Sequence, residues 1–184
     1  MKKLAAALVA AALALSAAPA HADVTKIDPS NDGGMSNGPE VDAGLKAAGE
    51  LTKVTLAPGD KTITVTVRVG AVHRDGSAQN ATRQSFLFSF DRIVDGFSYY
   101  RSFEFRNTDG KVRMQGNGVP PSSRCRSVVK YGAKNLSITL PWTCMGEFTR
   151  GSFVGSLYVS LQASSATQFT GDALVTKGKG FLLR

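Results

Sequence analysis

From residue 51 onward, hydrophobic and polar residues alternate with a period of two, the pattern of strands that bury one face. The clearest run is 62–69, in which isoleucine and valine alternate with threonine and arginine. Residues 51–57 precede this run and are joined to it by Pro58-Gly59-Asp60, a combination typical of turns. The two segments therefore predict an antiparallel hairpin with one apolar and one polar face.

The alternation recurs along the rest of the chain in short segments separated by turns. Asp95-Gly96 and Asp109-Gly110 each separate two alternating segments, which is a strong hairpin signal. Eight or nine strands without a helix of ordinary length predict an all-β fold, an antiparallel two-sheet sandwich of the jelly-roll or immunoglobulin-like kind. Besides the first hairpin, the predicted strands are 86–90, 97–106, 111–114, 128–131, 136–140, 153–161 and 180–183.

The first residues follow another pattern. Lys2 and Lys3 precede an apolar stretch at 4–18, and Ala20-His21-Ala22 follows it. A basic start, an apolar run and a small-x-small ending are typical of a bacterial secretory signal peptide. The run is shorter than the roughly 20 residues of a membrane-spanning helix. We therefore expect cleavage before Asp23 and a secreted, extracellular protein without a transmembrane segment.

Residues 23–50 differ from the rest in composition, being rich in glycine, aspartate, asparagine, serine and proline. This composition predicts an irregular acidic arm, with a single helical turn at 45–48 as its largest regular element. The predicted organisation is thus a signal peptide at 1–22, an arm at 23–50 and a sandwich domain at 51–184.

The formal net charge of the chain is +8, and it is unevenly distributed. Residues 23–60 carry a net charge of −4, and residues 61–184 carry +10. A basic body outside a cell favours attraction to wall polymers, anionic lipid or extracellular nucleic acid, although the sequence holds no specific nucleic-acid motif. The alternative is that the charge serves solubility alone.

Two cysteines, Cys125 and Cys144, remain after the signal, and an even pair in an exported chain predicts a disulfide. The hairpin of 128–131 and 136–140 brings them near its open end, slightly off register, and a bend at Pro141 would absorb the offset. Their spacing excludes a CxxC redox or zinc motif.

These features resemble a family of small exported β-sandwich proteins of uncharacterised function that are common in actinomycete-type bacteria. The resemblance covers most of residues 23–184 and implies a jelly-roll-like sandwich with one disulfide and no known activity. The chain departs from the family pattern after Asp42, where no isoleucine or leucine follows directly. The resemblance rests on the acidic, glycine-rich start, the run 62–67, the mid-chain cysteine, the strand 135–140 and the ending 141–146.

An arginine stands among aromatic residues in the segment 97–105. An arginine beside aromatic rings can form a platform for a sugar or a polyanion, because its guanidinium plane stacks on a ring. The alternative is that the rings fill the core and a bulge turns Arg101 outward. Arg124 and Arg126, on either side of Cys125, form a second basic candidate. The residues on one face of the predicted strand are Phe97, Tyr99, Arg101, Phe103 and Phe105.

The acidic arm contains Asp28-Pro29-Ser30-Asn31-Asp32-Gly33, which matches the front half of a calcium loop. In such loops alternate oxygen side chains converge on one cation, and glycine permits a sharp turn. The closing glutamate is one position late, at Glu40, and no helices are predicted beside the loop, so this is not an EF-hand. The alternative is an acidic arm that binds no metal. The candidate calcium ligands are Asp28, Ser30, Asp32 and Asp42.

The sequence offers little for catalysis. His73 is the one histidine after residue 22, and no G-x-S-x-G motif accompanies it. Asp91 and Asp95 flank a turn and are explained by turn chemistry. We therefore expect a protein that is not an enzyme and that needs no cofactor, calcium apart.

Together these features predict a secreted, non-catalytic β-sandwich protein that binds an anionic cell-wall or extracellular polymer. The alternative is an envelope structural or inhibitor-like protein-interaction module without a small ligand. The candidate ligand contacts are Arg101, Tyr99, Arg124 and Arg126.

Overall fold

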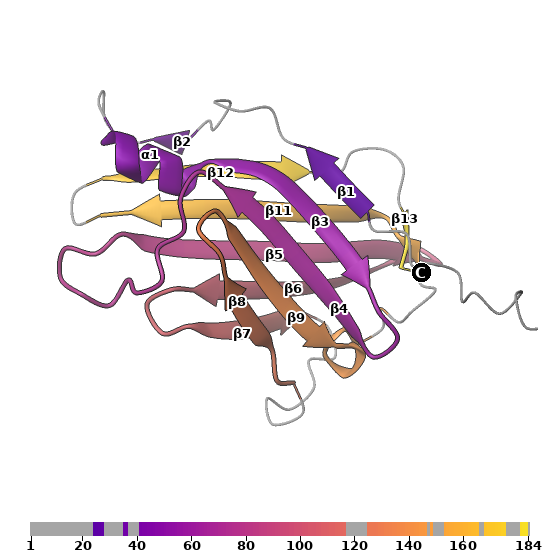
Figure 1. Ribbon diagram of the computed structural model, residues 1–184. Helices are drawn as coiled ribbons and strands as arrows, with labels where there is room; N and C mark the ends of the chain where they lie inside the picture. The colour runs from indigo at the N-terminus through magenta and orange to yellow at the C-terminus, as the bar shows by residue number, and fades with distance from the viewer. Residues whose placement is uncertain are drawn as a thin grey trace, which may run out of the picture.

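A computed structural model of the chain describes residues 24–27, 35–36, 41–116, 125–146, 148, 153–165, 168–175 and 181–183. Two antiparallel sheets pack face to face, and α1 (Ala43–Gly49) lies at one end of them (Figure 1). The predicted all-β, two-sheet sandwich is therefore confirmed. The predicted signal peptide lies outside the described residues. Within the described part of the chain, no helix combines the length and the hydrophobicity that crossing a bilayer requires.

The first sheet has five strands in the order β1-β3-β4-β9-β8. Both predicted hairpins in this sheet are confirmed, because β3 pairs with β4 and β8 pairs with β9, with Tyr131 opposite Leu136. The strands are β1 (Val24–Ile27), β3 (Leu51–Pro58), β4 (Thr62–Val69), β8 (Val128–Tyr131) and β9 (Asn135–Pro141).

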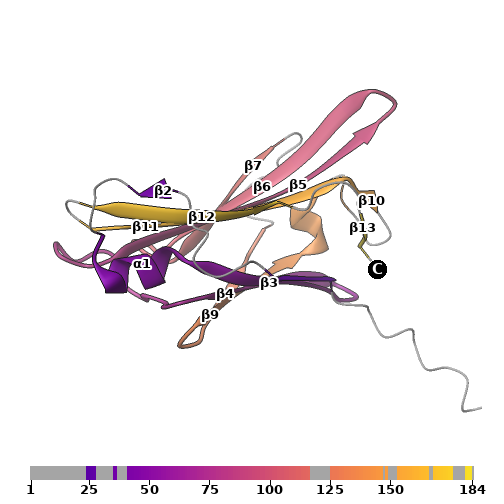
Figure 2. The same ribbon diagram turned by 90° about the horizontal axis from the view of Figure 1, so that it is seen from above.

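The second sheet has six strands in the order β2-β12-β11-β5-β6-β7. β10 (Phe153–Val154) and β13 (Phe181–Leu182) form a separate two-stranded ladder, in which β10 contacts β5 of the six-stranded sheet. Figure 2 shows the two layers from above, with the six-stranded sheet over the five-stranded one. The strands are β2 (Met35–Ser36), β5 (Arg83–Val94), β6 (Phe97–Arg106), β7 (Lys111–Gly116), β11 (Ser156–Ser164) and β12 (Phe169–Val175).

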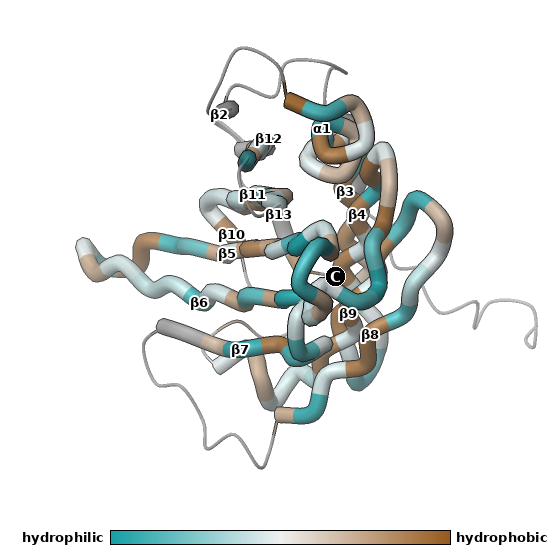
Figure 3. The backbone as a smooth tube through the Cα atoms, turned by 90° about the vertical axis from the view of Figure 1, so that its left-hand side faces the viewer, coloured by the Kyte–Doolittle hydropathy of each residue, from teal (hydrophilic) through white to brown (hydrophobic). Residues whose placement is uncertain are grey.

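The core lies between the sheets and is built from alternate positions of each strand. On β4 the isoleucine and valine side chains are buried, while the threonines between them face outward. The six-stranded sheet supplies an aromatic layer, in which the rings of Phe88 and Phe103 stack with centroids 5.1 Å apart. Figure 3 shows hydrophobic positions along β3, β4 and β9 in the middle of the molecule. Each large side chain buried in this way contributes roughly 1.5–3 kcal/mol, which is why the period of two determines the fold.

The prediction of an irregular arm at 23–50 is wrong for the segments that the structure describes. β1 pairs with β3, β2 pairs with β12, and α1 packs against β11 and β12. The helix has seven residues rather than a single turn, because the Asp42 side chain caps it. Asp42 Oδ1 accepts hydrogen bonds from the N–H groups of Gly44 (2.9 Å) and Leu45 (3.1 Å). This segment therefore adds one strand to each large sheet.

Two predictions near the C-terminus also need correction. β12 was not expected from the sequence, because Gly171 and Asp172 interrupt its apolar pattern. Asp172 is nevertheless buried, since its Oδ2 accepts a hydrogen bond from the Leu51 N–H at 3.0 Å. The single strand predicted at 153–161 is divided into β10 and β11 at Gly155, and Val154 is buried rather than facing outward.

Candidate functional site

Most outward residues of β11, β5, β6 and β7 away from the β5–β6 turn are polar, in contrast to the aromatic inner face of the sheet. In-register pairing across β11, β5, β6 and β7 arranges the outward residues in rows. Because neighbouring strands lie about 4.8 Å apart, each row presents its side chains at regular intervals. One row is Gln162, Ser85, Arg106 and Lys111, and the next is Ser160, Leu87, Glu104 and Arg113.

A cavity of about 390 Å³ lies at the end of this face where β5 begins. Arg83 and Arg106 line it together with Phe169, whose ring is accessible because the residue is 41% exposed. The cavity therefore combines two cations, hydroxyl and amide groups, and one aromatic ring. Its other lining residues are Gln84, Ser85, Thr108, Gln162, Ala163 and Ser164. We call this surface, with Lys111 and Arg113 beside it, the arginine face.

The positive charge of the arginine face is partly balanced. Arg106 Nε donates a hydrogen bond to Glu104 Oε1 at 2.6 Å. This hydrogen bond, together with the charge of Glu104, raises the pKa of Arg106, which stays protonated throughout the physiological range. Arg83 is exposed and forms no ion pair with any residue that the structure describes, so its guanidinium is available to an anionic ligand.

A buried hydrogen-bond network fixes the start of β5 and the end of β6, which carry the two cavity arginines. Asn107 Oδ1 accepts a hydrogen bond from the Gln84 N–H at 2.8 Å. Asn107 Nδ2 donates to the carbonyls of His73 (3.1 Å) and Thr82 (2.9 Å). Gln84 Oε1 accepts from the His73 N–H at 2.7 Å, so the backbone of His73 belongs to the network. Buried polar groups need such partners, and here they hold the loop before β5 against the sheet.

Arg101, the leading ligand contact proposed from the sequence, is buried. β5 and β6 pair without a register shift over residues 85–94 and 97–106, so the bulge that would turn Arg101 outward does not form. Its exposed fraction is 1%, and Gly146 lies so close that a Cβ at that position would collide with the guanidinium. A polymer at the surface therefore cannot reach Arg101. Tyr99 is partly buried, with its ring centroid 5.5 Å from the guanidinium carbon of Arg92.

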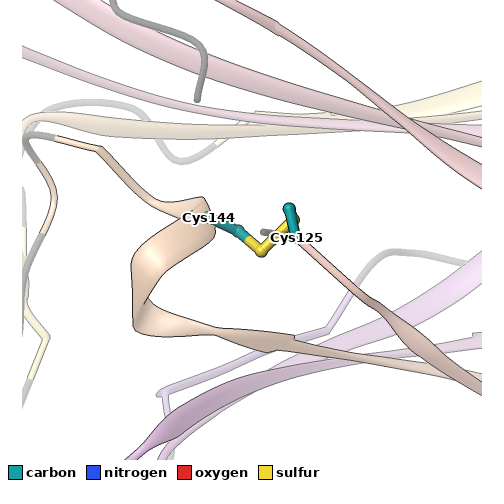
Figure 4. Close-up of a disulfide and its surroundings, with 2 residues drawn as sticks. All are labelled: Cys125 and Cys144. Carbon is teal, nitrogen blue, oxygen red and sulfur yellow. A yellow bond between two sulfur atoms is a disulfide. The ribbon is translucent and has the colours of Figure 1, made fainter. Parts of the chain in front are cut away.

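Cys125 and Cys144 form the predicted disulfide, with Cα atoms 5.2 Å apart (Figure 4). Cys144 ends the short helical turn η2 (Trp142–Cys144), which follows Pro141 and supplies the expected bend. The bridge ties the segment before β8 to the end of β9. Arg126 is exposed beside it, and Arg124 lies outside the described residues.

Of the four candidate calcium ligands, the structure describes Asp42. Asp42 is the N-cap of α1, and Asp28, Ser30 and Asp32 lie outside the described residues. Within the described ranges, no group of three or more histidine, cysteine, aspartate or glutamate residues could hold a metal ion. The calcium site therefore stays a prediction from the sequence of residues 28–33.

The arginine face is not predicted by the sequence. Arg83, Arg106 and Gln162 occupy the polar positions of the alternating strands, which is a weak signal because such positions usually face solvent. Phe169 belongs to β12, which was not predicted. Strand order and register are needed to bring these residues together.

The chain matches no protein-family model, and no curated protein is detectably similar to it in sequence. The function must therefore be inferred from the chemistry of the site.

Proposed function

We propose that this is a secreted, non-catalytic β-sandwich protein that binds an anionic polymer of the cell envelope or extracellular space through the arginine face. The observation that carries the proposal is the cavity in which Arg83 and Arg106 lie with hydroxyl and amide groups and the exposed ring of Phe169. The basic composition, the signal-like N-terminus and the resemblance to exported actinomycete-type proteins support the same proposal.

The groups in the cavity suit an acidic polysaccharide. A guanidinium can donate two parallel hydrogen bonds to one carboxylate or phosphate, which favours arginine over lysine for such ligands. An aromatic ring offers an apolar surface to the C–H groups of a sugar, while serine and glutamine side chains match its hydroxyl groups. The row of Gln162, Ser85, Arg106 and Lys111 extends across four strands, which offers a polymer several polar contacts in succession.

The opposite face of the sandwich has different chemistry. Its hydroxyl groups are paired with one another: Thr64 Oγ1 lies 2.9 Å from Thr139 Oγ1, and Thr66 Oγ1 lies 2.9 Å from Ser137 Oγ. Lys53 and Arg68 line a smaller cavity of about 260 Å³ beside them. Removing these two cations changes the net charge as much as removing two arginines from the arginine face, which makes them matched controls.

The proposal is tested with polygalacturonate as the anionic probe and dextran as the neutral one. Isothermal titration calorimetry should show that Arg83→Ala/Arg106→Ala binds polygalacturonate at least about tenfold more weakly than the unchanged protein, since each lost charged hydrogen bond costs roughly 1.5 kcal/mol or more. The variant Lys53→Ala/Arg68→Ala should change the affinity less than about threefold, because exposed charges at a distance are screened. Dextran should not bind measurably. If the two double variants weaken polygalacturonate binding equally, only the net charge matters, and the proposed binding site at the arginine face is wrong.

A further inference from the structure

The end of the β5–β6 hairpin carries exposed apolar side chains in a region that projects from the sandwich. We call residues 91–100 the hairpin tip. Figure 2 shows the hairpin tip bending away from the five-stranded sheet. Figure 3 shows hydrophobic residues near the end of this hairpin. Ile93 is 74% exposed and Phe97 is 68% exposed, and Val94 and Tyr100 are exposed as well. Clusters of exposed apolar residues at one place on a soluble protein mark an interaction site.

The turn that forms the tip is well defined. Val94 pairs with Phe97 across Asp95-Gly96, whose φ angles are 51° and 80°. Positive φ at both positions is the type I′ geometry that Asp-Gly favours and that matches the twist of a hairpin. The exposed apolar residues are therefore held on a continuous two-stranded ladder.

The apolar side chains occupy both faces of this ladder. Because side chains alternate along a strand, Val94 and Phe97 extend the inner face of the sheet, whereas Ile93 and Tyr100 lie on the outer face. A flat protein partner would cover one face and leave the other in water. An environment that surrounds the tip would cover both.

We propose that the hairpin tip inserts shallowly into the interface of an anionic lipid bilayer. The order of residues along the tip fits this medium: Ile93, Val94 and Phe97 lie nearest the turn. Tyr99 and Tyr100 follow roughly 7–10 Å behind, at the depth where amphipathic rings meet the head groups. Residues 61–184, which contain the tip, carry a net charge of +10, and this charge attracts an anionic membrane and disfavours self-association.

Two carboxylates restrict the depth of insertion. Asp91 accepts a hydrogen bond from the Ser156 hydroxyl at the base of the tip, on the side of the sandwich. Asp95 stands in the turn itself, and a carboxylate is costly in the hydrocarbon region. The tip therefore reaches the boundary between head groups and acyl chains and goes no deeper, as amphipathic interfacial segments do.

Co-sedimentation with vesicles of phosphatidylcholine and phosphatidylglycerol in a 7:3 ratio tests the proposal. Ile93→Ser/Phe97→Ser should bind the vesicles at least about tenfold more weakly. Each substitution removes the favourable free energy of transferring an apolar side chain from water into the bilayer interface. Val128→Ser, which changes an exposed apolar residue on β8, should bind as the unchanged protein does. The tip variant should keep its melting temperature and its affinity for polygalacturonate, so failure here is distinct from failure of the proposed polymer site.

A second variant separates a bilayer from a protein partner. Asp95→Asn removes the negative charge, and asparagine tolerates the positive φ of this turn position as aspartate does. The substitution should therefore raise the affinity for vesicles about threefold or more. If the tip binds a protein partner instead, this substitution should leave the affinity for vesicles unchanged. Absence of vesicle binding at low salt, vesicle binding that is unaffected by the tip variants, or concentration-dependent self-association lost in Ile93→Ser/Phe97→Ser would each overturn the proposal.

Discussion

Arg101 is a charged residue placed among the phenylalanines of the core, and its burial changes its expected role. The aliphatic part of an arginine packs against apolar neighbours, so truncation removes packing as well as charge. Gly146, with a φ of 61°, provides the space that the guanidinium occupies. Arg101 therefore belongs to the interior that supports the sheet.

We expect Arg101→Ala to lower the free energy of unfolding by about 2–4 kcal/mol, because it leaves a cavity next to large side chains. Urea denaturation followed by circular dichroism measures this change. Arg126→Ala, at an exposed position, should stay within about 0.5 kcal/mol of the unchanged protein. A stable Arg101→Ala protein that loses polymer binding would restore the platform hypothesis.

Asp109 is the titratable group with a clear role in a turn. Its carboxylate accepts a hydrogen bond from the Lys111 N–H at 3.0 Å and pairs with Arg113 at 2.5 Å. The Lys111 hydrogen bond is the largest of the contributions that lower the pKa of Asp109, and those from Arg113 act in the same direction. The ionised form is thus favoured in the β6–β7 turn.

Because the folded pKa lies below the unfolded value of about 3.9, this group stabilises the fold fully above about pH 4. The stabilisation is lost as the pH falls through the lower folded value. A carboxyl ¹³C NMR titration should place the Asp109 midpoint below the unfolded value, and Asp109→Asn should lose stability at pH 7 but less at pH 2. A midpoint at or above the unfolded value would contradict this account of the turn.

The β8–β9 hairpin shows how an element at a sheet edge is stabilised. β8 has four residues and lies at the end of its sheet, so it makes hydrogen bonds to β9 alone within the five-stranded sheet. The disulfide closes the open end of this hairpin. Trp142 anchors the same region from the other side, since its Nε1 donates to the Gly59 carbonyl at 2.9 Å.

Replacing both cysteines, as Cys125→Ser/Cys144→Ser, should lower the free energy of unfolding by about 3 kcal/mol in the chain-entropy model of disulfides. Hydrogen exchange should show the largest loss of protection in β8. Reduction of the unchanged protein with dithiothreitol should have the same effect as the double substitution. An unchanged melting temperature after complete reduction would show that the bridge does not stabilise the hairpin.

The elements that could be predicted from the sequence are those whose burial follows a strict period of two. β3, β4 and β9 alternate apolar and polar residues, and each was expected with nearly correct bounds. The sequence predicts a single turn at 45–48, whereas α1 extends over Ala43–Gly49 behind its capping residue Asp42. It does not predict β12, because the burial of Asp172 depends on Leu51, a partner far away in sequence. The exposure of Phe97 also depends on tertiary structure, since the hairpin extends beyond the sheet that would have covered it.

At the scale of the whole molecule, the sandwich presents two outer faces with different chemistry. On the five-stranded sheet, threonine and serine hydroxyls bond to one another. On the six-stranded sheet, Arg83 and Arg106 line a cavity together with Gln162 and Phe169. The sequence predicts contacts to an anionic polymer at Arg101, Tyr99, Arg124 and Arg126. It does not predict the arginine face, because the register that gathers the outward residues is not visible in the sequence.

Charge-driven binding at the arginine face should also depend on salt. The affinity for polygalacturonate should fall as sodium chloride is raised from 50 to 500 mM, because exposed charges are screened within about 10 Å at 0.1 M. Fluorescence anisotropy with a labelled polymer would record the change. An affinity that does not vary with salt would contradict an ionic contact.

The most direct test of the account is a ¹H–¹⁵N NMR titration of the isotopically labelled protein with polygalacturonate. We predict shift changes concentrated on the outer face of the six-stranded sheet, at Ser85, Arg106 and Gln162 and their neighbours, with the signals of Thr66 and Arg68 on the opposite face unmoved. Shift changes centred on Thr66 and Arg68, or spread evenly over every basic residue, would contradict a binding site on the arginine face.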